Sequence, residues 1–590
     1  MDTWKKHVVS GGGWLLLGLA VAGYCQSFLA YHFFYQEQFY MFRFSKEYAA
    51  DTLWQVGGVT AYLAAFVVQF FLIPFVGPLV MGLSVVVLGW LMKNVWRKIA
   101  VSCSLPLLYL LPGICTVWAC MDFNYHFDGL LSLLLALVCL NGYLRIGSFR
   151  WRMVYGAVAA WVGYLLAGPH LLLAVIAAVL WEVCCGKSRW KGGSLLLLPW
   201  GFGLPLLLYG LEWGGEWRLL ATPDAYYHPL LLSQKVNYLP GILVLLNVLA
   251  ACILHRSRKS LSGWRLWASW GIQICLLAGI FHQGIRHYSN DRNYEIKVLD
   301  YYSRTGQWQQ ILDYPGLRAG QNAMHACYQN LALSHLGKLG DELFRYPQCG
   351  RWGAVISWNK TVNASMLLSD VYYQMGNLAL SQEMAFEGMI ASERAVNPRL
   401  LLRLVQTNLI GGHDAVAEKY ISLLEETCMY AEQAGAYRRF LHHPELLRAD
   451  EELGARQACI QHVSGLTNSQ KAAVDLFQLV RSNPEYRPAF QYCGAICLLC
   501  KDLKSFGELM ECWKQAETGY SLPVAFQEAW VFMHAGEPEL WAAYGVSEAV
   551  AGRFKEYGGL VSAGRQDHSL AYRLQNRFGD TFWFYYMFTK

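Results

Sequence analysis

Long runs of apolar residues alternate with short polar loops through the first half of the chain. A membrane-spanning helix needs about 20 predominantly apolar residues. On this criterion the pattern predicts nine spans, at residues 13–33, 77–92, 100–119, 129–144, 153–166, 169–183, 193–211, 238–254 and 264–283. The fifth and sixth runs are short and are separated only by Gly168-Pro169-His170. We therefore expect these two runs to form a tight helical hairpin.

One further apolar segment, residues 59–75, is predicted not to cross the membrane. Lys5 and Lys6 precede the first run, and the loop 93–98 is also basic. By the positive-inside rule both places lie in the cytoplasm, so only one crossing fits between them. Residues 59–75 are therefore expected to form an interfacial or re-entrant helix on the outer side, ended by Pro74.

The charges divide the chain into two dissimilar halves. Residues 1–290 hold 20 Lys/Arg and 10 Asp/Glu, whereas residues 291–590 hold 28 Lys/Arg and 32 Asp/Glu. In the nine-span topology 15 of those 20 basic residues lie in the cytoplasm, including Arg256, Arg258 and Lys259, and eight of the ten acids lie outside. The pattern predicts a bacterial inner-membrane protein with a cytoplasmic N-terminus and a periplasmic C-terminal domain. Because the positive charge sits in short loops between spans, we expect no nucleic-acid partner.

From residue 291 onward the apolar positions recur with helical spacing, in pairs of helices joined by short turns. The predicted pairs are 366–375 with 378–390 across Gly376-Asn377, 397–410 with 414–426, and 483–500 with 503–516. These spacings of about 30–40 residues resemble tetratricopeptide repeats, which usually bind proteins or peptides. The predicted fold is thus all-α: a polytopic transmembrane bundle at residues 1–290, followed by a soluble repeat domain at 291–590.

Candidate chemistry gathers in the predicted outer loops, residues 34–76, 120–128 and 212–237. Loop 120–128 carries Asp122, Asn124, His126 and Asp128 between two spans. Paired carboxylates can bind a divalent cation such as Mg²⁺ or Mn²⁺ against a phosphate, or one can act as a general base. The other candidates are Glu37, Asp51, His170, Arg218, Tyr226 and His228. Polar loops and interfacial tyrosines also have a purely structural explanation.

This layout resembles the GT-C superfamily of membrane glycosyltransferases, of the oligosaccharyltransferase and protein mannosyltransferase type. The resemblance lies in the arrangement of residues 1–290, with an acid after the first span and a second acidic motif between spans three and four. It implies that Glu37 or Asp51 is the first acid and that Asp122 and Asp128 form the second motif. The spacing D-x5-D departs from a DxD motif, and no WWD-type acceptor motif is present.

The resemblance also implies a substrate and an assignment of roles. The donor would be a glycan on a polyprenyl phosphate in the membrane lipid, and the acceptor an extracytoplasmic protein held by the repeat domain. Catalytic roles, with a metal ion at Asp122 and Asp128, would belong to Glu37, Asp51, Asp122 and Asp128. Substrate-binding roles would belong to Asn124, His126, His170, Arg218, Tyr226 and His228.

Three alternatives remain at the level of sequence. The chain could be a membrane-anchored repeat scaffold for envelope assembly. It is also similar to O-antigen ligases, which carry basic and His residues in a large outer loop late in the chain. Arg218 and His228 would take those places here. A lipid-linked glycan transporter is the third, although the predicted spans hold almost no charge apart from Glu182. The whole chain looks like an uncharacterised bacterial family of polytopic proteins with repeat-type tails, a likeness that implies no activity.

Overall fold

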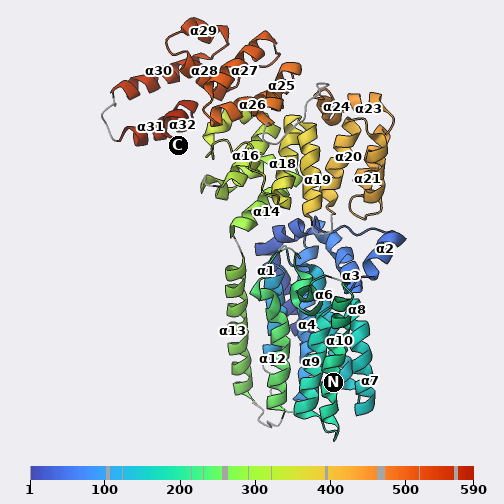
Figure 1. The fold of residues 1–590 in the computed structure, drawn as a ribbon. Helices are drawn as coiled ribbons and strands as arrows, with labels where there is room; N and C mark the ends of the chain where they lie inside the picture. The colour runs from blue at the N-terminus through green and yellow to red at the C-terminus, as the bar shows by residue number, and fades with distance from the viewer. Residues whose placement is uncertain are drawn as a thin grey trace. The chain divides into compact units, whose positions relative to one another are not determined.

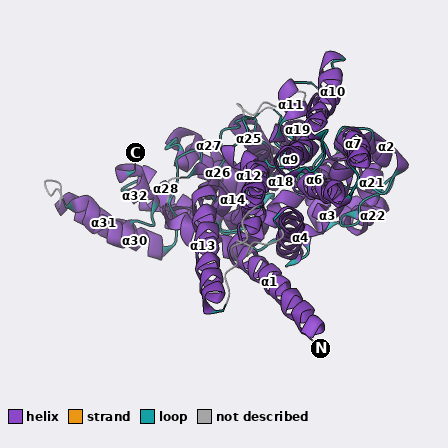
Figure 2. Cartoon of the chain, turned by 90° about the horizontal axis from the view of Figure 1, so that it is seen from below, coloured by secondary structure: helices purple, strands orange, loops and turns teal. Residues whose placement is uncertain are grey.

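All regular structure in the described part of the chain is helical (Figure 2). The computed structural model describes residues 2–100, 107–122, 124–213, 215–229, 231–255, 263–289, 291–319, 322–392, 396–460, 472–516, 518–563 and 569–589. The chain divides into two units. Unit 1 comprises Met1–Tyr294 with Glu426–Met429, and unit 2 comprises Glu295–Glu425 with Tyr430–Lys590.

Unit 1 is a bundle of long helices that run side by side (Figure 1). Its longer helices are α1 (Asp2–Glu37), α3 (Gly58–Val68), α4 (Val76–Ile99), α5 (Leu111–Ala119), α6 (Phe127–Arg145), α7 (Phe149–Val158), α9 (His170–Cys185), α10 (Leu197–Gly210), α12 (Leu239–Leu254) and α13 (Trp264–Tyr288). Shorter ones are α2 (Lys46–Leu53), α8 (Tyr164–Ala167), α11 (Trp217–Ala221) and the 3₁₀ turns η1 (Gln69–Leu72), η2 (Leu107–Leu110), η4 (Lys191–Leu196), η5 (Pro223–Tyr226) and η6 (Lys235–Tyr238). A π-helical turn, η3 (Ala159–Gly163), joins α7 to α8.

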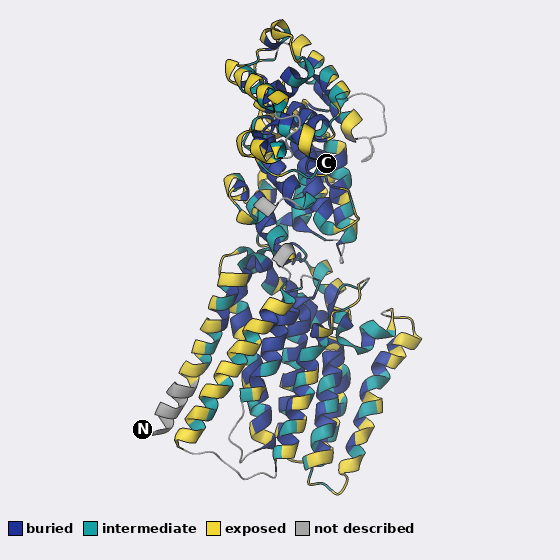
Figure 3. Cartoon of the chain, turned by 90° about the vertical axis from the view of Figure 1, so that its left-hand side faces the viewer, coloured by how far each residue is buried: buried dark blue, intermediate teal, exposed yellow. Residues whose placement is uncertain are grey.

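Among the described residues, five helical segments are long and apolar enough to cross a membrane. They are Gly11–Glu37, Val76–Ile99, Phe127–Arg145, Lys191–Gly210 and Lys235–Leu254. Leu16 and Leu83 are exposed, as lipid-facing side chains would be. Figure 3 shows exposed positions along the outer helices of the bundle. Unit 1 therefore has the helices of a membrane protein.

The remaining predicted spans differ from this set. Segments Leu107–Ala119 and His170–Cys185 are apolar but shorter, and the predicted span 153–166 is divided among α7, η3 and α8. The nine-span count therefore stays a prediction. Residues 101–106 of the predicted third span, and Arg256, Arg258 and Lys259, lie outside the described residues.

The segment predicted to be interfacial is a short helix that ends early. Helix α3 and turn η1 end at Leu72, and the chain reverses at Phe75, whose φ is 70°. The segment Gly58–Leu72 is too short to count among the candidate spans. Its buried face carries small residues, including Ala61, Ala64 and Ala65.

Small residues and buried amides hold the helices of unit 1 together. A Cβ added at Gly82 of α4 would lie 2.4 Å from the Gly18 carbonyl oxygen of α1, so these helices can approach this closely only with glycine. Asn247 of α12 accepts a 2.9 Å hydrogen bond from the Trp96 indole of α4. Asn141 of α6 donates to the Leu91 carbonyl of α4. Such bonds replace those that water cannot supply.

Arg152 and Glu182 form a buried ion pair in unit 1. The Arg152 Nε lies 2.6 Å from the Glu182 Oε1, and the Glu182 side chain is completely buried. Arg152 also donates to the carbonyls of Ile146 and Gly147, and the Tyr143 hydroxyl donates to Glu182. The pair joins α7 to α9, and the bonds with Tyr143, Ile146 and Gly147 connect both helices to the end of α6.

Unit 2 is a succession of antiparallel helix pairs (Figure 1). Its helices of eight or more residues are α14 (Asp291–Arg304), α16 (Ala323–His335), α18 (Val362–Met375), α19 (Leu378–Ala391), α20 (Pro398–Ile410), α21 (Asp414–Glu425), α25 (Ala472–Ser482), α26 (Arg487–Leu499), α27 (Leu503–Gln515), α28 (Val524–Met533), α30 (Glu548–Ala563) and α31 (Leu570–Phe578). Shorter helices are α15 (Trp308–Leu312), α17 (Leu339–Glu342), α22 (Ala431–Tyr437), α23 (Pro444–Ala449), α24 (Glu451–Gln457), α29 (Pro538–Ala543) and α32 (Phe582–Phe588).

The turn between α18 and α19 follows directly from its two residues. Gly376 ends α18 in the left-handed conformation, with φ 82°, and Asn377 caps α19 by accepting a bond from the Leu380 amide. This confirms the predicted pair. The predicted helix start at Pro484 is wrong, because α25 ends at Ser482 and α26 begins only at Arg487, with Pro488 in its first turn.

A buried carboxyl in unit 2 leads to a prediction about pH. Glu528 of α28 is 3% exposed and accepts a 2.8 Å bond from the Phe582 amide. Burial raises the pKa of its carboxyl to about 8. The unfolded chain has the ordinary pKa near 4.3, so between about pH 4.3 and 8 the folded state holds a proton that the unfolded state lacks. The stability that the protonated Glu528 carboxyl contributes is therefore fully present below about pH 4.3, and it is lost as the pH rises to about 8.

We expect Glu528→Gln to remove this pH dependence and to raise the free energy of unfolding at pH 7 by on the order of 3 kcal/mol. The amide keeps an acceptor oxygen for Phe582 but carries no charge. Hydrogen exchange of the α28 and α32 amides in the full chain, at pH 5 and pH 8, measures the effect. The exposed Glu539→Gln is the matched control. Equal pH dependence in both variants would contradict the assignment.

Candidate functional site

Two predicted outer loops pair with each other through their backbones. Tyr125 and Tyr227 form an antiparallel bridge. The His126 amide donates to the Tyr226 carbonyl at 2.8 Å, and the His228 amide donates to the Asn124 carbonyl at 3.0 Å. Residues 124–126 and 226–228, about 100 positions apart in the sequence, are therefore fixed side by side at one end of the bundle.

Asp122 fastens this pairing with its side chain. Its Oδ1 accepts bonds from the backbone and side-chain nitrogens of Asn124, both at 3.0 Å. Its Oδ2 accepts from the Tyr227 hydroxyl at 2.7 Å and the Gln234 amide at 2.9 Å. The bonds from Tyr227 and Gln234 bind loop 120–128 to loop 212–237, and the two from Asn124 lie within loop 120–128. Tyr227 and Gln234 are not among the predicted site residues.

Asp128 and His126 form a second, more deeply buried pair. Asp128 is the second residue of α6, where a negative charge is favoured by the helix dipole. The His126 Nδ1 lies 3.9 Å from the Asp128 Oδ1, and both side chains are about one-tenth exposed. A carboxylate beside an imidazole can orient the ring and stabilise its protonated form.

Tyr226 connects His170 to this end of α6. Its hydroxyl bonds to Ser132 of α6, donates to the Ala167 carbonyl and accepts from the His170 amide. The His170 ring stacks on the Tyr226 ring, with centroids 4.5 Å apart. The close approach requires glycine, since a Cβ at Gly168 would lie 2.8 Å from the Tyr226 hydroxyl. The sequence predicted that Tyr226 and His170 bind substrate, and the contacts here give both residues a structural role.

Arg218 lies in loop 212–237 and is held by other residues of that loop. It donates to the carbonyls of Pro229 and Leu231, and its Nε lies 3.4 Å from Glu216 and 3.8 Å from Asp224. Its side chain remains 28% exposed. Asp224 is buried and also accepts a 2.5 Å bond from the Tyr238 hydroxyl. The guanidinium is thus pre-positioned by its own loop and open on one side.

The end of α1 joins the cluster, whereas Asp51 does not. Glu37 is the last residue of α1 and is buried, so it ends a helix where the sequence predicted a loop. Its neighbour Gln36 donates to the Tyr125 carbonyl at 3.5 Å, and the Tyr40 hydroxyl accepts from the Phe127 amide. Asp51 lies exposed on α2, outside the contacts described for this cluster.

The phenols at this end stay neutral. Burial raises the pKa of Tyr226 and Tyr125 far above the usual value, and burial together with the Asp122 carboxylate raises that of Tyr227. They therefore act as hydrogen-bond donors and acceptors. In the described ranges no group of three or more His, Cys, Asp or Glu could hold a metal ion. Mg²⁺ or Mn²⁺ at Asp122 and Asp128 stays a prediction.

Comparison with known proteins identifies a family for the whole chain. A model described as a family of unknown function (DUF6057) matches residues 5–589. The chain belongs to this family. The DUF6057 match runs through both units, so membership concerns the two-unit chain and not the bundle alone. No curated protein and no solved structure matches it.

Proposed function

We propose that the chain is a membrane glycosyltransferase that moves a glycan from a polyprenyl-phosphate-linked donor to an acceptor outside the membrane. The observation that carries the proposal is the convergence of four distant segments on one end of a bundle of apolar helices. These are the end of α1, loop 120–128, the start of α9 and loop 212–237. Together they bring Glu37, Asp122, Asn124, His126, Asp128, His170, Arg218, Tyr226 and His228 to one place.

The proposed reaction breaks the bond between the sugar carbon and the donor phosphate oxygen, and forms a bond from that carbon to an acceptor hydroxyl or amide. The acceptor proton passes to the His126–Asp128 pair, and polyprenyl phosphate or diphosphate leaves. The Arg218 side chain is 28% exposed, and its guanidinium would bind the phosphate. Asp122 holds Asn124 and the two loops in place, and its two oxygens already accept four hydrogen bonds.

A groove between α5 and α13 supports a lipid donor. Its volume is about 650 Å³, and its lining includes Trp118, Leu276, Gly279, Ile280 and His287. Helix α13 touches α5 closely at Gly284, where an added Cβ would lie 2.1 Å from the Trp118 ring. Away from that contact the groove is mostly apolar, so we propose that it receives the hydrocarbon chain of the donor.

Filling this groove should weaken donor binding. Gly279→Phe places a ring in the groove without backbone strain, since nothing lies within 4 Å of a Cβ there. We expect about a tenfold rise in KM for the lipid-linked donor with kcat nearly unchanged, because ground-state and transition-state binding are lost equally. Gly271→Phe, on the same helix and equally open, is the control. A rise of the same size in the control would contradict the proposal.

The finer topology belongs to the same proposal. Nine spans with a cytoplasmic N-terminus would place the site and unit 2 in the periplasm of a bacterial inner membrane. The antiparallel pairing of α18 with α19 and of α20 with α21 supports a tetratricopeptide-like array. Such an array would present a protein acceptor to the site.

The experiment that tests this function compares membrane glycoproteins and lipid-linked glycans between wild-type and deletion cells. We expect glycosylated envelope proteins to disappear and the lipid-linked donor to accumulate. Unchanged pools of both would refute glycan transfer.

The helix pairs of unit 2 favour a second candidate, a non-enzymatic scaffold for envelope assembly. Full-length chains carrying Asp128→Asn or His126→Ala separate the two. If these variants fully rescue the deletion phenotype, the chain acts as a scaffold, because the proposed proton acceptor is absent.

A further inference from the structure

A polar cavity lies within unit 2, among α22, the following turn and α24. Its volume is about 250 Å³. The lining consists of Gln433, Ala436, Tyr437, Arg439, Phe440, Asp450, Glu452 and Leu453. Polar groups and apolar side chains both face it, and neither unit 1 nor the loop Glu426–Met429 contributes to it.

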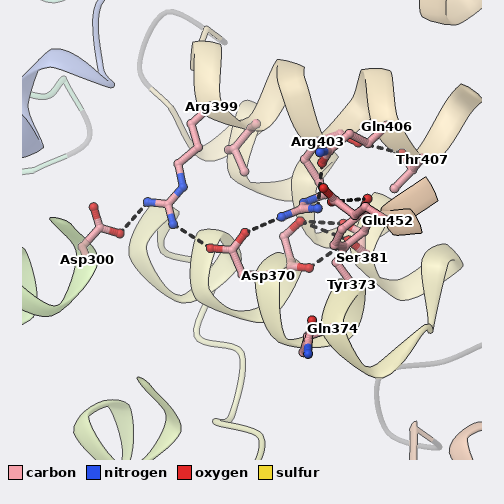
Figure 4. A network of polar contacts seen from close by, with 12 residues as sticks. Asp300, Asp370, Tyr373, Gln374, Ser381, Arg399, Arg403, Gln406, Thr407 and Glu452 are labelled. Carbon is pink, nitrogen blue, oxygen red and sulfur yellow. Dashed lines mark hydrogen bonds and ion pairs between the residues drawn. The ribbon is translucent and has the colours of Figure 1, made fainter. Parts of the chain in front are cut away.

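A network of polar contacts includes Glu452, which lines the cavity (Figure 4). The Tyr373 hydroxyl donates to the Glu452 Oε1 at 2.9 Å. The Tyr373 ring is enclosed between two guanidinium groups, with Arg403 3.6 Å and Arg456 4.1 Å from its centroid. Arg456 also donates to the Tyr373 and Glu452 carbonyls. Glu452 is therefore pre-positioned and does not have to be ordered by a ligand.

The same network reaches a second residue of the cavity lining, Tyr437. Arg403 bonds to Asp370 and to Gln406, and the Gln406 amide donates to the Tyr437 hydroxyl at 2.8 Å. Arg399 bridges Asp370 to Asp300 of α14. Charge pairs this well buried cost desolvation free energy and are weak evidence for stability. We therefore ask whether these charge pairs position the residues that line the cavity.

The charges of the lining select the class of ligand. The carboxylates of Asp450 and Glu452 disfavour an anionic ligand. The Arg439 guanidinium lies 3.5 Å from the Asp450 carboxylate and offsets part of its charge, so a cationic ligand is less favoured as well. Carboxylates accept, the guanidinium donates, and Gln433 and Tyr437 do both. Ala436 and the small parts of Leu453 and Phe440 that line the cavity supply its apolar surface. This combination fits a neutral ligand that has many hydroxyl groups and one apolar face.

We propose that this cavity binds a carbohydrate chain, as a glycan-recognition site in unit 2 separate from the transfer site of unit 1. The inference goes beyond the proposed function and does not depend on it, because binding requires no transfer. Hydroxyl groups of the sugar would donate to Asp450 and Glu452 and accept from Arg439 and Gln433. The apolar face of the sugar would pack on Leu453 and Phe440.

The test uses the full chain in detergent micelles, applied to an array of defined oligosaccharides and then titrated by calorimetry with the tightest binder. Two variants probe the cavity: Glu452→Gln removes a charged acceptor, and Ala436→Phe fills the space without removing a polar group. We expect each to weaken binding at least tenfold. Glu451→Gln, the adjacent exposed acid on α24, is the matched control and should change binding less than twofold.

Several outcomes would overturn the inference. One is that no oligosaccharide binds the wild type more tightly than Ala436→Phe. Another is that Glu451→Gln weakens binding as much as Glu452→Gln. Selective capture of basic peptides in place of glycans would assign the cavity to a different ligand. Transfer by unit 1 is measured separately with purified lipid-linked donor, so failure of transfer in unit 1 and failure of binding in unit 2 are seen separately.

Discussion

Replacing Asp128 with Asn is expected to reduce glycan transfer at least 100-fold while the protein stays folded in the membrane. The substitution keeps the size of the side chain but removes the negative charge that faces His126. Without that carboxylate, the pair that is proposed to receive the acceptor proton is incomplete. General acid–base groups typically contribute about 10²–10⁴-fold to a rate. Transfer from purified lipid-linked donor to acceptor, measured in membranes, gives the rate.

Two comparisons make this result specific. Asp51→Asn removes an exposed acid outside the cluster and should transfer at the wild-type rate. His126→Ala should match Asp128→Asn, and the double variant should be no slower than either, because the two residues act as one unit. Size-exclusion chromatography of each variant reports folding. Wild-type transfer by Asp128→Asn would remove this pair from the proposed mechanism.

Arg152→Ala is expected to destabilise unit 1 by about 3–5 kcal/mol, the cost of leaving a buried charge without its partner. Glu182 is completely enclosed, and Arg152 supplies its 2.6 Å contact as well as bonds to the Ile146 and Gly147 carbonyls. Removal of the guanidinium leaves all three acceptors without that donor. Thermal unfolding in detergent, followed by tryptophan fluorescence, measures the loss.

A paired replacement distinguishes this cause from general disruption. Arg152→Met with Glu182→Gln removes both charges and keeps the volume, so it should recover most of the lost stability. Arg150→Ala, on the same helix and exposed, should shift unfolding little. If the double variant is as unstable as Arg152→Ala, the ion pair is not the source of the effect.

Local features of this protein could be predicted from sequence because their causes lie within a few residues. Apolar runs predicted the helices of unit 1, and Gly376-Asn377 predicted the α18–α19 turn through a left-handed cap and an Asn side chain. The density of polar groups in 120–128 identified that loop. Pro484 misled the prediction, since a proline can begin a helix or lie in the turn before one, and here Pro488 takes the first helical turn.

Other features depended on segments far apart in the chain, and only the tertiary structure decided them. Spacing in the sequence cannot show that Asp122 accepts bonds from Tyr227 and Gln234, or that Asp51 is exposed on α2. It also cannot pair Glu182 with Arg152, or enclose Tyr373 between two arginines. Helix formation is governed by local propensity and periodicity, whereas a side chain's partners are chosen by packing between distant helices, where buried polar groups must all find bonds.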